Sequence, residues 1–497
     1  MDKYTLIIDQ GGHSSRAIAF NQQGVAVDCC SEVTPPPLES TEGFVEFSST
    51  PLIQSSNSLL HEILQRLSHR FKATDKPPID ALGVIAQRSS LIACNKTTAQ
   101  AITPMISWQD TRHADWLAQQ SFDIEEWQQL TGLRLSAHAG ASKIRWLLDH
   151  HPEVQRCAKK NNLMFIPWGA YLLHQLMNKT ELVCDISLAA RTGLSEYGVH
   201  AWSDKLLSLF DIPKTCLPPI VPSAYDYGNI TVGGHVIPVK LLGGDQQFIP
   251  LAYGEAALAD SAFLNIGSGA FIQARTVTAV QTDKTPKQAN GLLTSQLMVS
   301  NNKTAIDIME GTINGAATSL DWWQAQQQTP LTFTEVNHAL THTSTAPIFI
   351  NTLTGTGSPY WIPAQTARFI TMHDIKISTQ EQKTVAILES ILFSCKINFD
   401  LICEENTDIE KIIISGGLSA SDPLCQKLAD LTGVAILRYD DTEASARGAA
   451  FYLHSSDHYP VAQAPTRFTP KTTGNAVEVR FTRYREEMEK LSKKHNK

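Results

Sequence analysis

The chain opens with short apolar runs that are broken by glycine-rich turns. Residues 4–9 and 16–20 are two such runs, and the turn between them contains Gly11 and Gly12. After a second turn, residues 25–27 form a third run. This pattern predicts an antiparallel meander of three strands whose first hairpin is rich in glycine.

A comparable unit recurs in the second half of the chain. Residues 261–266 form an apolar run, residues 267–269 a Gly-Ser-Gly turn, and residues 270–275 a second run. Recurrence of a structural unit indicates duplicated halves. A chance repeat of so short a unit is the alternative.

Spacings of three and four between apolar residues predict helices. Ser142 is placed to cap a helix over residues 142–148, and the apolar positions of residues 385–399 mark one face of a long helix. Residues 213–234 are expected to be rich in loops, and residues 483–497 to form a charged helix or a frayed end.

A third glycine turn, at Gly416 and Gly417, follows the buried-type strand predicted at residues 411–415. Beyond its double glycine, Ser421 or Asp422 can cap a helix that has Pro423 in its first turn and ends before Gly433. The order strand, double glycine, helix is typical of a segment that faces a phosphate or a nucleotide.

Composition places the chain among ordinary soluble globular proteins. Its 497 residues are 42% hydrophobic and 18% charged, which excludes a disordered or coiled-coil chain. This length suggests more than one domain, and we predict a boundary near residue 250, with domains at 1–250 and 251–497.

Charge and cysteine pattern exclude several further classes of protein. A net charge of -8 has the wrong sign for broad neutralisation of nucleic-acid phosphates. Nine cysteines without a Cys-x-x-Cys pair suggest neither a disulfide framework nor a zinc ribbon. The N-terminal apolar run is very short and ends in an acid at Asp9, which is unlike a signal peptide. No stretch of the chain is suited to spanning a membrane. We therefore expect a cytoplasmic protein.

The candidate functional residues are three glycine turns and two acidic residues. The chain has no Walker A sequence, protein-kinase set or Gly-x-Ser-x-Gly elbow. Glycine turns let backbone N–H groups approach an anion. Asp9 and Asp245, each at a strand end beside such a turn, could hold a divalent cation and accept a proton from a hydroxyl. Tight hairpins and ordinary turn acids are the alternative for each feature alone.

Taken in order, these residues resemble the FGGY family of carbohydrate kinases, and within it the glycerol kinases. The matching segments run along nearly the whole chain, at residues 9–18, 87–88, 107–112, 131–133, 185–192, 244–247, 267–271, 310–311, 357–361, 415–417 and 446–450. The resemblance implies an α/β, two-domain fold like that of actin and hexokinase, built from duplicated ribonuclease H-like halves around an interdomain cleft. It also implies ATP and Mg²⁺ as cofactors.

The resemblance assigns a role to each candidate residue. Asp245 is the expected general base, and Asp9 and Asp245 are the expected magnesium ligands. The expected sugar or polyol site consists of Arg88, Ser89, Trp108, His138, Asp245, Gln246 and Phe271. The expected nucleotide site consists of Gly11, Gly12, His13, Ser14, Arg16, Gly267, Ser268, Ala317, Asp321, Gly417 and Ser421.

Departures from the family pattern affect the expected substrate. Gly12 and His13 stand where the family usually has hydroxyl residues, and Ser89 and His138 stand where glycerol kinases have Glu and Tyr. Residues 317–321 also differ from the glycerol kinase sequence on the adenosine side. We therefore expect a kinase for a small sugar or polyol other than glycerol.

The sequence leaves three other functions open. They are glycerol kinase proper, a catalytically silent sugar sensor on the same fold, and a chaperone-like ATPase. Small-molecule partners are expected, with no nucleic acid and no membrane, and a homodimer is left open.

Overall fold

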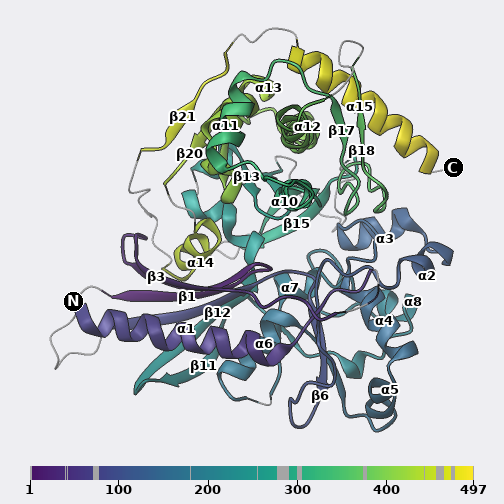
Figure 1. The fold of residues 1–497 in the computed structure, drawn as a ribbon. Helices are drawn as coiled ribbons and strands as arrows, with labels where there is room; N and C mark the ends of the chain where they lie inside the picture. The colour runs from purple at the N-terminus through teal and green to yellow at the C-terminus, as the bar shows by residue number, and fades with distance from the viewer. Residues whose placement is uncertain are drawn as a thin grey trace.

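The protein has two lobes that are stacked on each other (Figure 1). The computed structural model describes residues 3–39, 41, 43–70, 78–179, 181–254, 256–276, 290–298, 305–372, 378–440, 443–454, 464–471 and 476–495. The chain builds the lower lobe of Figure 1 first and most of the upper lobe afterwards.

A six-stranded mixed sheet forms the centre of the first lobe, in the order β11-β12-β5-β1-β2-β3. Its strands are β1 (Tyr4–Gln10), β2 (Ser14–Asn21), β3 (Ala26–Val33), β5 (Ile79–Ala86), β11 (Ala224–Val232) and β12 (His235–Gly244). Strand β1 is antiparallel to β2 and parallel to β5, and β5 is parallel to β12.

The second lobe repeats this topology in a seven-stranded sheet, in the order β15-β16-β14-β13-β19-β20-β21. Its strands are β13 (Ser261–Ile266), β14 (Ala270–Arg275), β15 (Leu293–Met298), β16 (Ala305–Ile313), β19 (Lys411–Ser415), β20 (Ala435–Arg438) and β21 (Thr466–Phe468). Strand β13 is antiparallel to β14 and parallel to β19, as β1 is to β2 and β5. The two lobes therefore have the duplicated arrangement that the repeated hairpin predicts.

Shorter strands form small accessory sheets. They are β4 (Glu46–Phe47), β6 (Leu91–Asn95), β7 (Met105–Ile106), β8 (Leu163–Pro167), β9 (Cys184–Asp185), β10 (Ile220–Val221), β17 (Ile348–Ile350) and β18 (Arg368–Ile370).

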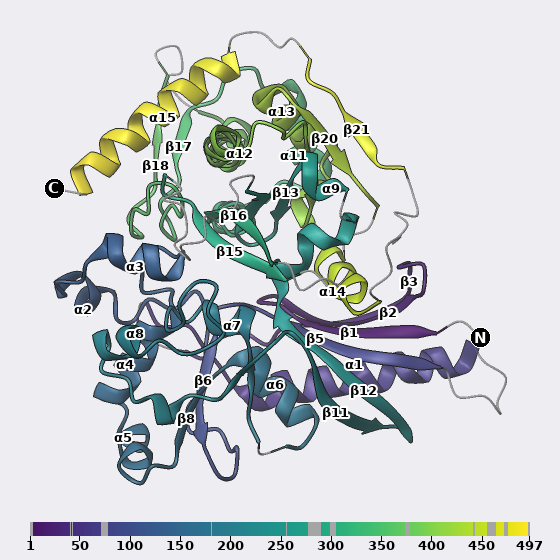
Figure 2. The ribbon, with the colours of Figure 1, turned by 180° about the vertical axis from the view of Figure 1, so that it is seen from behind.

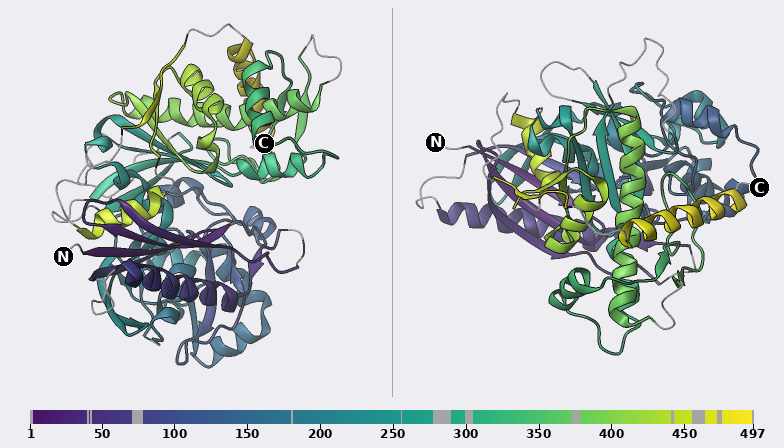
Figure 3. Two further views of the ribbon diagram at one scale, coloured as in Figure 1. Left: turned by 60° about the vertical axis from the view of Figure 1, so that its left-hand side comes forward. Right: turned by 90° about the horizontal axis from the view of Figure 1, so that it is seen from above.

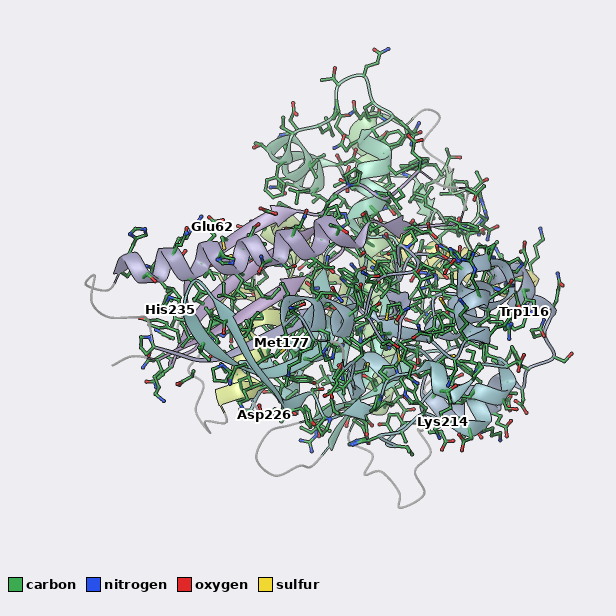
Figure 4. The ribbon with its side chains drawn as sticks, turned by 90° about the horizontal axis from the view of Figure 1, so that it is seen from below. Glu62, Trp116, Met177, Lys214, Asp226 and His235 are labelled. Carbon is green, nitrogen blue, oxygen red and sulfur yellow. The ribbon has the colours of Figure 1, made fainter. Side chains whose placement is uncertain are left out.

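Helices cover the outer faces of both sheets. In the first lobe they are α1 (Ser49–Arg70), α2 (Ala114–Gln119), α3 (Ile124–Thr131), α4 (Gly140–His150), α5 (Pro152–Lys159), α6 (Trp168–Leu176), α7 (Ile186–Ala190) and α8 (Asp204–Leu209). Helix α1 crosses the face shown in Figure 4 and carries Glu62, which pairs with Arg66, on its solvent side.

The remaining helices follow residue 256. They are α9 (Ala257–Asp260), α10 (Ala317–Gln324), α11 (Phe333–His342), α12 (Gln380–Glu405), α13 (Asp422–Thr432), α14 (Ala444–His454) and α15 (Ala476–His495). Three 3₁₀ segments are η1 (Lys214–Cys216), η2 (Asp245–Tyr253) and η3 (Gly417–Ala420).

Helix α14 belongs late in the sequence but lies against the first sheet, between the lobes (Figure 3). It is rich in small residues, and Gly448 approaches Phe248 so closely that a Cβ atom would lie 1.8 Å from the Phe248 oxygen. On β1, Ile7 faces this helix whereas Leu6 and Ile8 face the core of the first lobe. Burial of both sheet faces explains why β1 is an uninterrupted apolar run.

Several local expectations are confirmed and others need correction. Helix α13 is capped by Ser421, as predicted. Ser142 does not cap a helix but lies inside α4, because its hydroxyl bonds back to Ala137 and Ala139 in the preceding loop. Residues 213–234 are not mainly loop, since they contain β10 and β11.

The C-terminal segment is helical. Helix α15 begins before the predicted charged tail and is anchored by buried Phe481, Tyr484 and Met488. All nine cysteines are free thiols. In the parts of the chain that the structure describes, no helix combines the length and apolar character that crossing a membrane requires.

Candidate active site

A cavity of about 630 Å³ lies between the lobes. It is lined by residues from both sheets, at the ends of strands where the glycine turns occur. Of the predicted site residues, Asp9, Gly11, Gly12, His13, Ser14, Arg16, Arg88, Ser89, Trp108, His138, Asp245, Gln246, Gly267, Ser268, Phe271, Ala317, Asp321 and Gly417 line it. Tertiary structure thus brings together groups that are hundreds of residues apart.

The two glycine hairpins face each other across this cavity. Gly11 N donates to Ser14 O over 3.0 Å in the first, and Gly267 N donates to Gly269 O over 2.9 Å in the second. The His13 ring and the Ser268 hydroxyl are hydrogen-bonded across the gap, with Nδ1 and Oγ 2.8 Å apart. His13 therefore bridges the two lobes at the place where phosphates are expected.

Arg16 provides a second bridge between the lobes. Its guanidinium donates to the Glu443 carboxylate over 2.7 Å, just before helix α14 begins. Arg16 also lies close enough to Asp9 to favour the ionised carboxylate. The first hairpin is thus held to the second lobe by side chains from two of its residues.

On the nucleotide side, the first turn of α10 rests on the second hairpin. Ala317 N donates to Gly267 O over 3.0 Å, and Ala316 N donates to Ser268 O over 2.8 Å. Gly416 has φ +87°, and a Cβ atom there would lie 2.6 Å from the Ile266 oxygen, so only glycine fits.

Ser421 is the predicted nucleotide residue that does not line the cavity. Its hydroxyl accepts from Leu424 N over 3.3 Å and donates to the Asn337 side chain over 2.6 Å. It borders a separate, smaller cavity beside α10. The bond from Leu424 N caps α13, and the bond to Asn337 ties this cap to α11.

Asp9 and Asp245 form a pair of carboxyl groups in the cavity. Burial, together with the Asp245 charge, raises the pKa of Asp9 to about 8, and Arg16 opposes this effect. Burial also raises the pKa of Asp245, against the influence of Arg88. Asp245 accepts 2.7 and 3.3 Å bonds from the backbone and side chain of Gln246.

This pair has the donor chemistry that Mg²⁺ prefers. Two like charges held close together are stabilised by a cation, and the phosphate hairpins lie in the same cavity. Within the described ranges, no group of three or more His, Cys, Asp or Glu residues could hold a metal. The pair fits Mg²⁺, which is commonly held by one or two carboxylates with waters and substrate phosphates.

The floor of the sugar side is a buried ion cluster. Glu310 of β16 accepts 2.8 and 3.0 Å bonds from Arg88 and a 2.5 Å bond from Arg191. Gln273 donates to the same carboxylate over 2.8 Å. Burial raises the pKa of Glu310, but Arg191 and Arg88 outweigh it and lower that pKa to about 2. The cluster joins the lobes, because Arg88 follows β5.

A wall next to this cluster contains Ser89 and His138. Ser89 has φ +62°, and its hydroxyl bonds to Arg191 O over 3.3 Å. The His138 ring is 3.0 Å from Trp108 O, and burial lowers its pKa, so the imidazole is neutral near pH 7. Because a carbonyl oxygen can only accept, Nδ1 carries the proton and Nε2 is an acceptor for a ligand.

A buried lysine supports this wall from behind. Lys143 of α4 donates to Ser89 O over 3.2 Å and to His138 O over 3.0 Å. Burial lowers its pKa to about 7. The two predicted sugar-site residues are therefore positioned by one shared side chain.

Four further residues belong to the site by geometry. Glu310 and Arg191 lie in matching segments but were not predicted as site residues. Asn265 donates from its side chain to Gln246 over 3.2 Å. It interrupts the apolar run of residues 262–266 just before the second hairpin, and this is a signal that sequence can supply. Arg134 lines the cavity from a loop and has no comparable signal.

Duplicated sheets that present two glycine hairpins to one interlobe cavity define a two-domain phosphotransferase with the fold of actin and hexokinase. Residues 4–251 match the N-terminal domain of the FGGY family of carbohydrate kinases, and residues 277–453 match its C-terminal domain. The chain therefore belongs to the FGGY family of carbohydrate kinases.

Individual relatives agree with this assignment. The chain is 29% identical to a glycerol kinase of Acidovorax ebreus over 97% of both chains. It is 31% identical to a glycerol kinase of Streptococcus pyogenes serotype M5, over 90% of this chain and 87% of that protein. The Plasmodium falciparum glycerol kinase with ADP has the same fold, with a TM-score of 0.81 at 20% identity over 99% and 98% of the two chains. The protein is thus a kinase that phosphorylates a sugar or polyol with ATP.

Proposed function

We propose that Asp245 is the general base in transfer of the γ-phosphoryl group of ATP to a hydroxyl of a small sugar or polyol. The observation that carries this proposal is the position of Asp245, which lies after β12 in the same cavity as both glycine hairpins. A carboxylate there can accept the hydroxyl proton while the oxygen attacks phosphorus. Gln246 orients the carboxylate through its two hydrogen bonds.

Asp9 and Asp245 would hold Mg²⁺ beside the phosphates. When bound, the ion would neutralise charge that develops on the transferred group. The hairpin N–H groups bind phosphate oxygens, and the two lobes exclude water that would compete with the sugar for the phosphoryl group. The free thiols of all nine cysteines support a site of action in the reducing cytoplasm.

The test is an ADP-release assay with polyols, ketoses, aldoses and sugar acids. Asp245→Asn should lower kcat about a hundred- to ten-thousand-fold, the range for general-base catalysis, while sugar binding measured by calorimetry is retained. Asp226→Asn, at a largely exposed residue of the same lobe, is the matched control and should have wild-type activity. Equal rates for the two variants would remove Asp245 from this role.

Glycerol is the second candidate substrate, because the relatives described above are named glycerol kinases. Ser89 makes glycerol less favourable, since its short hydroxyl is engaged by Arg191 O. A kcat/KM for glycerol above that for every longer polyol or sugar would establish glycerol instead. Sugar binding without ADP release for any compound would support the silent sensor.

A further inference from the structure

Arg134 differs from the other arginines that line the cavity. Arg16 is paired with Glu443, and Arg88 and Arg191 share Glu310. Across the described residues, neither a hydrogen bond nor an ion pair engages the Arg134 guanidinium. Arginine keeps its proton at any physiological pH, so a partly buried positive charge faces the cavity without a counter-ion.

The loop that carries Arg134 is held in place at both ends. It joins α3 to α4, and Thr294 of β15 donates to Gly132 O over 2.8 Å at its start. Gly132 has φ +71°, and a Cβ atom there would lie 2.5 Å from Thr294 O. At its end, His138 O accepts from Lys143. Strand β15 lies at the edge of the second lobe nearest the first (Figure 2).

Arg191 supplies a second observation that points to an anion in this cavity. Arg191 also lines it, is 8% exposed, and has a buried Nη1 that lacks a hydrogen-bond partner in the described structure. Glu310 supplies a single negative charge to two guanidiniums. Asp245 acts on both of these guanidiniums and supplies the second negative charge, so Arg88 and Arg191 are balanced. Among the residues that the structure describes, the charge of Arg134 is therefore the unbalanced one on the sugar side.

We propose that the acceptor substrate is a polyhydroxy carboxylate, a sugar acid, whose carboxylate is bound by Arg134. This inference rests on the proposed function, because it names the substrate class of the same site. A planar guanidinium with one positive charge matches a carboxylate in charge and bidentate geometry. The neutral hydroxyl end of such a substrate would then face Asp245, and the His138 Nε2 atom would accept a bond from one of its hydroxyls.

Matched pairs of substrates test this proposal. Aldonic acids of four to six carbons are compared with the alditols of the same configuration, and sugar phosphates form a third arm. Wild-type kcat/KM should be higher for the acids. Arg134→Gln should lower kcat/KM for the best acid about ten- to a hundred-fold, the range for loss of a hydrogen bond to a charged group, and should leave the alditol within about twofold.

Two more variants separate recognition from a structural effect. Arg134→Lys keeps the charge and should retain part of the preference for acids. Arg156→Gln, at a largely exposed side chain on helix α5 of the same lobe, is the matched control and should behave as wild type. The proposal is overturned if wild type prefers neutral polyols or sugar phosphates, or if Arg134→Gln lowers activity on acid and alditol equally.

A binding experiment distinguishes failure of this proposal from failure of the proposed function. Calorimetry with the best-bound aldonate is done on wild type, on Asp245→Asn and on the double variant with Arg134→Gln. Binding that depends on Arg134 without phosphorylation by wild type would support the carboxylate site and contradict the proposed reaction. If wild type phosphorylates the aldonate but binds it equally well without Arg134, the proposed reaction is supported and the carboxylate site is contradicted.

Discussion

Replacing Glu310 by glutamine tests the ion cluster that joins the lobes. The wild-type carboxylate is fully buried and accepts bonds from Arg88, Arg191 and Gln273. Glutamine keeps the shape but removes the charge, and its NH₂ group would face a guanidinium. Two buried cations would then lie close together without a counter-charge, so we expect Glu310→Gln to lower the free energy of unfolding.

Two estimates of the loss agree. Removing one partner of a buried ion pair costs about 3–5 kcal/mol. Independently, a pKa that falls from 4.5 to about 2 corresponds to about 3 kcal/mol. Because the folded-state pKa is the lower one, this stabilisation is complete above pH 4.5 and is lost as the pH falls toward 2. The stability gap between wild type and Glu310→Gln should therefore narrow below pH 4.5.

Urea unfolding followed by tryptophan fluorescence measures this gap. Glu389 offers a matched control, because Arg480 donates to it over 2.6 and 2.7 Å and Lys427 over 3.1 Å in a cluster that does not line the cavity. Glu389→Gln should lose a similar amount of stability with an unchanged KM for sugar. Glu310→Gln should lose stability and also raise that KM, since Arg88 would no longer be positioned.

The reasoning would be refuted by a Glu310→Gln protein that is within about 1 kcal/mol of wild type at pH 7, the range of a solvent-exposed pair. It would also be refuted by a stability gap that stays constant from pH 7 down to the lowest pH at which both proteins fold. An unchanged KM with the expected loss of stability would keep the cluster as a structural link but remove its role in positioning Arg88.

Three further predictions concern the cavity walls. Gly12→Thr with His13→Thr should lower the KM for ATP, because the new hydroxyls can bind phosphate and the His13–Ser268 hydrogen bond no longer competes with it. A side chain fits at position 12, since the nearest atom to a Cβ there is 3.8 Å away. An unchanged KM would mean that backbone N–H groups alone bind the phosphates. The free energy of unfolding should rise with pH between about 7 and 10.5, because in this range Lys143 is protonated in the unfolded chain but has lost its proton in the folded protein, where burial lowers its pKa. Urea unfolding of Lys143→Met should no longer show this rise. Ser89→Glu with His138→Tyr should raise kcat/KM for glycerol relative to longer substrates, and a ratio that does not change would contradict the assignment of this wall to the acceptor.

Local sequence determined the parts of this protein that depend on neighbouring residues. The strand–glycine–strand units at residues 4–20 and 261–275, and helix α13 between Ser421 and Gly433, form as predicted. Their strand alternation, turn glycines and caps are satisfied by contacts a few residues away. The same local rule failed for Ser142, because its hydroxyl found acceptors in the preceding loop rather than at a helix end.

Tertiary structure alone decided which side chains meet in the cavity. Glu310 pairs with Arg88 across 222 positions of sequence, and His13 meets Ser268 across 255. These pairs form because burial of apolar faces, including the packing of α14 on the first sheet, fixes how the two lobes are placed. Arg134 shows most clearly what the sequence leaves undetermined. The sequence shows that the side chain is charged, but only the positions of the neighbouring acids show that it has no ion-pair partner in the described part of the chain.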